Sequence, residues 1–197
     1  MVWDDAAFSP PPSHDESIEL VGTHLRLTGT ISLGRFGRLT DLINASSGYL
    51  RVHDARLLRR NGDPTSLVLP ELMVDQDEIS FIAQHEAAQP EPGASGGFAE
   101  PGFGSAAESR LAREFVMFTP GHTVTGKVHV FGQTDVAGFV DATDPRFVPV
   151  TGVTTRSLAD HRIISHYPFM LINRTQMIAA SEVGPHGDIE PDDVPDL

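Results

Sequence analysis

The residues best suited to binding chemistry are arginines, and they are unevenly distributed along the chain. Thirteen of the fourteen basic residues are arginine, and seven of those lie between residues 26 and 60. A guanidinium group presents a planar fork of donors that fits carboxylates and phosphates. These arginines could form a face that binds an acidic partner. The simpler interpretation is a solvated surface on which they pair with the neighbouring acids Asp41, Asp54 and Glu71.

Two glycine-containing segments resemble nucleotide-binding loops, and each lacks an essential part. Residues 121–127 have the spacing of a phosphate-binding P-loop, but Val128 stands where a serine or threonine must hold magnesium. That motif also needs a helix directly after it, whereas residues 128–130 alternate like a strand. Residues 102–107 resemble a dinucleotide fingerprint without the strand that must precede it. We interpret both as coincidences of composition.

The histidines do not show the spacing of a metal site. Nine are present, but the pairs His122/His129 and His161/His166 do not form a His-Glu-x-x-His helix. Cysteine is absent, which excludes disulfides, thiolate ligands and a cysteine nucleophile. The sequence therefore predicts no catalytic, cofactor-binding or metal-ligating residues, and a protein that is not an enzyme.

The strands that would carry these side chains occur in two similar copies. Residues 25–33 and 122–130 both place apolar residues at every second position, as a half-buried strand does. A Thr-Gly pair recurs in both, so that Gly29 and Gly126 fall where a side chain would point inward. A glycine at such a position indicates a bend or a close backbone approach. Its recurrence predicts a strongly curved strand.

A short helix is predicted after this strand in each copy. Apolar residues recur there at the i, i+3 and i+4 spacing of one helix face. The two sets are Leu39, Leu42, Ile43 and Val136, Phe139, Val140. Thr134 is the predicted N-cap of the second helix. Further strands follow, with a four-residue turn at 75–78 in the first copy and at 173–176 in the second.

The predicted fold is mainly β: two tandem small, partly open β-barrels of the Sm-like or SH3-like kind, each with about five strands and one short helix. The predicted segments are a tail without fixed structure (1–16), a first barrel (17–86), a flexible Ala/Gly/Pro linker with a short helix from Ala106 to Arg113 (87–113), a second barrel (114–182) and a disordered acidic tail (183–197). A domain of about 70 residues is only marginally stable alone. We therefore expect the copies to dock, or to pair between chains.

The first helix segment carries a family resemblance. Residues 38–44, Arg-Leu-Thr-Asp-Leu-Ile-Asn, followed by a strand that begins at Tyr49, resemble an uncharacterised bacterial family of small β-domains. Its members share the pattern Arg-x-Ser/Thr-Asp-x-Leu-Asn before an aromatic-led strand. The resemblance covers the first copy well and the second in part, where Asp135, Gly138 and Asp141 take the places of the Arg, Asp and Asn. It implies a fold rather than an activity.

A fainter similarity links the chain to Sm-like proteins. It consists of Gly29, then Asp41 and Asn44, then the later Asp54-Ala55 pair. The similarity implies a nucleotide pocket lined by Asp41 and Asn44. The longer, helical spacing between these residues departs from the Sm-like pattern.

Charge is concentrated at the chain ends. The formal net charge is −13; four acids and no base precede residue 17, and five acids and no base follow residue 182. Acidic tails repel nucleic acids and anionic membranes. The C-terminal tail could also cover the arginine-rich face of the first copy.

The sequence predicts a non-enzymatic protein of the bacterial cytoplasm that mediates protein–protein assembly or scaffolding, through a protein partner or self-association. We expect no cofactor, because neither nucleotide-binding motif is complete. We expect no membrane insertion, because no signal peptide or long apolar stretch is present. The alternative is an RNA- or nucleotide-binding module that uses the arginine-rich face. The predicted partner-binding residues are Arg35, Arg38, Asp41, Asn44, Arg51 and Arg56.

Overall fold

The computed structural model describes residues 14–59, 63–84, 111–130, 135–142 and 144–183. The strands are β1 (Asp15–Gly22), β2 (Arg26–Ser32), β3 (Tyr49–Leu58), β4 (Pro64–Asp75), β5 (Ile79–Gln84), β6 (Leu111–Phe118), β7 (His122–Val130), β8 (Phe147–Ser157), β9 (Ile164–Asn173) and β10 (Ala179–Glu182). The helices are α1 (Leu39–Ala45) and α2 (Val136–Asp141), with short 3-10 turns η1 (Gln76–Glu78) and η2 (Arg174–Gln176). Within these ranges, no helix has the length and apolar content needed to cross a membrane.

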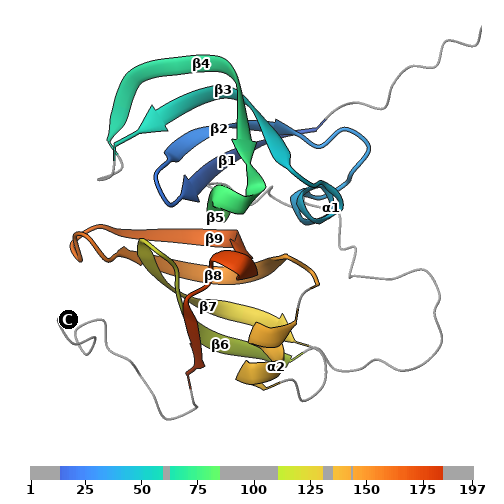
Figure 1. Cartoon of the computed structure of the whole chain (residues 1–197), viewed down its shortest axis with the longest axis vertical. Helices are drawn as coiled ribbons and strands as arrows, with labels where there is room; N and C mark the ends of the chain where they lie inside the picture. The colour runs from blue at the N-terminus through green and yellow to red at the C-terminus, as the bar shows by residue number, and fades with distance from the viewer. Residues whose placement is uncertain (1–13, 60–62, 85–110, 131–134, 143, 184–197) are drawn as a thin grey trace, which may run out of the picture.

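All ten strands belong to one antiparallel sheet with the order β10-β6-β7-β8-β9-β5-β1-β2-β3-β4. The first half (residues 14–84) and the second half (residues 111–183) run through the same series of elements. Figure 1 shows the halves one above the other, with β5 and β9 at the boundary between them. The mainly β prediction is confirmed. Two separate small barrels are not confirmed, because β5 pairs with β9 and the sheet is continuous and open.

The predicted close approach at the strand glycines is confirmed in both halves. A Cβ added to Gly29 would lie 2.6 Å from Val52 Cγ1, and one added to Gly126 would lie 2.6 Å from Val150 Cγ1. Opposite these glycines the ladder shifts register, and the facing strands contain Asp54 (φ 49°) and Gly152 (φ 59°). A bulge of this kind bends a strand and increases its twist.

Each half has its own apolar core, and the cores exchange residues. Phe147 and Leu171 of the second half pack into the core of the first. Val21, Phe81 and Ala83 of the first half pack into the core of the second. Deep burial of this kind contributes roughly 1.5–3 kcal/mol for each large apolar side chain. The two halves therefore form one folded body.

Several predicted boundaries need correction. β6 begins at Leu111 and pairs along its length with β7, so residues 111–113 are strand, not linker or helix. Asp15 and Glu16 pair with β2 and belong to β1, not to the tail. The amide of Val183 donates to Glu114 O, which extends the β6–β10 ladder. The remaining tail and linker predictions, and Ala106 to Arg110, lie outside the described residues.

The helix predicted within each copy and the two closing turns are confirmed, with one change of cap. Leu39 and Ile43 are buried on α1, and Phe139 is buried on α2. Asp135, not Thr134, is the N-cap of α2, because its carboxylate accepts a bond from Gly138 N. Asp75 and Asn173 cap η1 and η2 through their side-chain oxygens.

Candidate functional site

The four predicted arginines lie on the surface of the first half. Arg51 and Arg56 are both exposed on β3, on the side away from its buried residues. Arg51 lies 3.5 Å from Glu71 on β4. Arg35 stacks over the ring of Phe36, and Arg38 is the N-cap residue of α1. Their role in partner binding stays a prediction.

Asn44 has a different environment from the other predicted residues. Its Nδ2 donates to Phe147 O at 2.9 Å, and its Oδ1 accepts from Phe147 N at 2.8 Å. It therefore joins α1 of the first half to the start of β8 in the second. Asp41, one turn earlier on the same helix, is exposed. The role of Asn44 and Asp41 in partner binding stays a prediction.

A second polar connection between the halves surrounds Glu19, which is buried on β1. Arg26 Nε lies 2.6 Å from Glu19 Oε1, and the Tyr167 hydroxyl donates to Glu19 Oε2 at 3.0 Å. Burial, together with the carboxylate of Glu19, raises the pKa of Tyr167 to about 12. A buried charge must be paired and hydrogen-bonded to be tolerated. The three side chains satisfy that requirement across the boundary.

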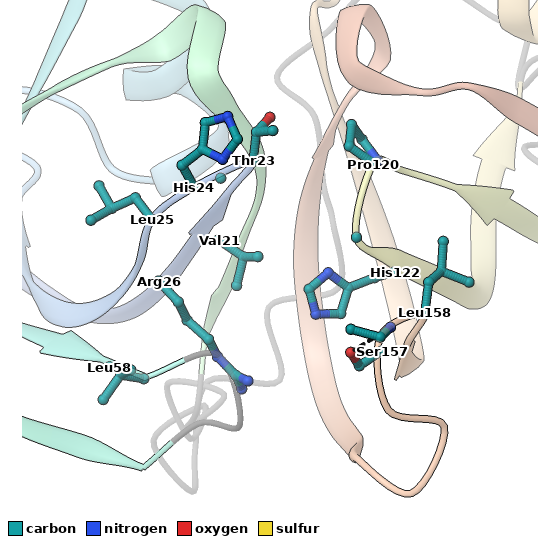
Figure 2. Close-up of a pocket in the computed structure, with 13 residues that line it drawn as sticks. Val21, Thr23, His24, Leu25, Arg26, Leu58, Pro120, His122, Ser157 and Leu158 are labelled. Carbon is teal, nitrogen blue, oxygen red and sulfur yellow. Dashed lines mark hydrogen bonds between the residues drawn. The ribbon is translucent and has the colours of Figure 1, made fainter.

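A cavity of about 380 Å³ lies beside this network, between the β1–β2 turn and the second half. Figure 2 shows Arg26 and His122 entering it from opposite halves. Burial, with the nearby Arg26 charge, lowers the pKa of His122 to about 4, so the imidazole is neutral at pH 7. The Ser157 hydroxyl accepts from the amides of Ala159 and Asp160. Arg26 and the Ser157 hydroxyl are therefore both engaged with the protein itself.

The other end of the boundary is held by the two 3-10 turns. Asn173 Nδ2 donates to Gln76 O at 3.2 Å and to Ile79 O at 2.8 Å. Arg146 pairs with Asp77. We call the contact of α1, η1 and β5 with β8, β9 and η2 the junction. It combines a backbone ladder, exchanged core residues and specific polar bonds.

β4 is the counterpart in the first half of β9, the strand that pairs with β5 in the junction, and it lies at one end of the sheet. Among the described strands, β4 pairs only with β3. Tyr49 corresponds to Phe147, because they pair with the cap residues Asp75 and Asn173 of the two 3-10 turns. Met73 corresponds to Leu171, because each precedes its cap residue by the same number of positions. Phe147 and Leu171 are 0% exposed in the junction, whereas Tyr49 is 62% and Met73 46% exposed. We call β4 with Tyr49 the outer β4 edge.

Sequence reasoning missed this edge as a candidate site. The signal was present, because the aromatic-led strands and closing turns of the two copies can be aligned residue by residue. It could not be used without knowing which copy's strand is covered. Unpaired strand edges with apolar side chains are templates for adding another strand.

The part of the chain described above contains no cluster of three His, Asp or Glu side chains that could hold a metal ion. No family model, curated protein or solved structure matches the chain. The resemblances to an uncharacterised bacterial family and to Sm-like proteins therefore stay predictions.

Proposed function

We propose that this chain is a non-enzymatic assembly protein whose outer β4 edge binds a β-strand of a protein partner. One observation carries the proposal: the positions that the junction buries, Phe147 and Leu171, have exposed apolar counterparts in Tyr49 and Met73. A strand added there would continue the ten-stranded sheet by main-chain hydrogen bonds, as in other cases of β-strand addition.

The chemistry of the outer β4 edge supports this use. Leu67 and Val68 on the same strand are also exposed, so apolar surface extends along β4. Natural edge strands are usually protected by charges, prolines or a covering segment. Here Pro70 and the Arg51–Glu71 pair interrupt the edge, but Tyr49 and Met73 remain accessible beside them. Such a partly protected edge suits selective pairing rather than open aggregation.

Site-specific crosslinking tests the proposal. A photoreactive residue is placed at Met73 in the full chain, in the cells that produce it, and crosslinked peptides are identified by mass spectrometry. The matched control is Ile164, which is similarly exposed at 44% but lies outside the outer β4 edge. We expect adducts with a defined strand segment from position 73 and none from position 164. Absence of an adduct from position 73 would overturn the proposal.

The alternative, RNA or nucleotide binding, has one favourable observation. The bulge at Asp54 leaves both Arg51 and Arg56 exposed on β3. The nearby carboxylate of Glu71 offsets the charge of Arg51, and Asn44 is engaged in the junction. Salt-dependent binding to single-stranded RNA that is lost in an Arg51→Ala/Arg56→Ala variant would favour this function.

A further inference from the structure

The second half also has an open edge, and its exposed residues correspond to buried ones in the junction. Among the described strands, β10 pairs only with β6. Val140 on α2 is 41% exposed and Ile178, beside β10, is 68% exposed. Their counterparts in the first half, Ile43 and Ser80, are 0% and 2% exposed, and Ile43 belongs to the core cluster that Phe147 and Leu171 join. We call β10 with Val140 and Ile178 the outer β10 edge.

Resting on the function proposed above, we propose that the partner of the outer β4 edge is the outer β10 edge of a second copy of this chain. The two copies join head to tail, in the register that β9 and β5 use within one chain. Tyr49 and Met73 of one copy then cover Val140 and Ile178 of the next, as Phe147 and Leu171 cover the first half.

The two outer edges can pair in the register that the junction uses. Within the chain, β5 residues 81–84 pair with β9 residues 169–172. The corresponding pairing between copies joins residues 179–182 of β10 to residues 71–74 of β4. Pro168 lies directly before the paired residues of β9, and Pro70 lies at the same place on β4. A proline has no N–H to donate, so neither residue can add a donor to its ladder at this position.

The polar contacts of this second join differ from those of the junction. Asp141 stands where Asn44 lies, and Asp75 stands where Asn173 lies, so neither can donate to the facing carbonyls. Glu71 and Glu182 would face each other, although each already pairs with an arginine of its own half, Arg51 or Arg113. The join between copies is therefore weaker than the junction and depends on protein concentration.

The symmetry of the join determines what it builds. A head-to-tail contact uses two different surfaces, so each added copy leaves one free β4 edge and one free β10 edge. Growth ends in a ring where the rotation between copies closes, and otherwise gives an open filament. An edge-to-edge dimer of two β4 strands would instead stop at two copies.

A mixing experiment with the full chain tests this inference. Met73→Asp blocks the outer β4 edge and Ile178→Asp blocks the outer β10 edge, and both positions are exposed, so the fold should survive. Light scattering across a concentration series should show oligomers for the unmodified chain and monomers for each variant alone. An equimolar mixture of the two variants should form a one-to-one dimer. Leu67→Asp, exposed on β4 outside the paired residues, is the matched control and should still form oligomers.

A gain-of-function variant guards against a contact too weak to detect. Asp141→Asn supplies the donor that Asn44 supplies in the junction, and should strengthen association about fivefold, the effect of one net hydrogen bond. Association of the unmodified chain without a dimer in the variant mixture would overturn the head-to-tail join. A monomer in both the unmodified chain and Asp141→Asn would also overturn it. In either case, a crosslink from Met73 to a different protein would leave the proposed function standing.

Discussion

Asn44 holds Phe147 by both of that residue's backbone groups, donating to its carbonyl and accepting from its amide. An asparagine side chain in this position acts like one more residue of a β-ladder. It connects α1 of the first half to β8 of the second, across 103 positions of the sequence.

Asn44→Asp should weaken this connection. The carboxylate cannot donate, and one of its oxygens would face the Phe147 carbonyl. We expect the free energy of unfolding to fall by about 1–3 kcal/mol, measured by chemical denaturation. Asp41→Asn, an exposed change on the same helix, is the control and should alter it by less than about 0.5 kcal/mol. Equal losses in the two variants would contradict the role of Asn44.

Tyr167→Phe should destabilise the second connection between the halves. It removes the hydroxyl that donates to the buried Glu19 carboxylate, at a cost of roughly 1.5–3 kcal/mol. Because the pKa of Tyr167 is raised from 10.0 to about 12, the folded protein keeps that proton longer than the unfolded chain. Stability from this group is therefore present below pH 10 and is lost as the pH rises toward 12. The loss between pH 10 and 12 should be smaller in Tyr167→Phe, and an unchanged alkaline profile would argue against the assignment.

His122 should contribute acid sensitivity. Its pKa is lowered from 6.5 to about 4, so between those values the unfolded chain binds a proton that the folded protein does not. Stability from neutral His122 is therefore present above pH 6.5 and declines as the pH falls toward 4. His122→Leu places at this position the residue type found at its counterpart, Leu25. Denaturation curves at pH 7 and pH 5 should differ less in this variant than in the unmodified chain; a difference of the same size would count against the prediction.

Gly29→Ala should be more damaging than Gly126→Ala. Both added Cβ atoms would lie 2.6 Å from a valine methyl, but that of Gly29 also lies 2.8 Å from His53 O, whereas the nearest backbone atom to that of Gly126 is 3.2 Å away. Backbone cannot move aside as a side chain can, so we expect Gly29→Ala to cost about 1–3 kcal/mol. Gly37→Ala, where a Cβ meets open space, is the control. Thermal denaturation of the three variants should rank them in this order.

The sequence determined the local structure because local structure follows from local pattern. Period-two apolar residues specified the strands, and the spacing of Leu39 and Ile43 specified the buried face of α1. Gly29 and Gly126 correctly indicated close backbone approach. Each of these features depends on neighbours a few residues apart, so a single chain carries the information.

Only the tertiary structure decided that β5 pairs with β9. The ladder between them is made of backbone groups, which every residue except proline presents alike, so no residue type marks the pairing in the sequence. The contact of Asn44 with Phe147 between the halves also appears only in the tertiary structure. The pairing of β5 with β9 also buried Phe147 and Leu171 and left Tyr49 and Met73 exposed. The two copies look alike in sequence but differ in which strand is unpaired. Because β9 of the second half pairs with β5 of the first, the sheet ends on β4 in the first half and on β10 in the second.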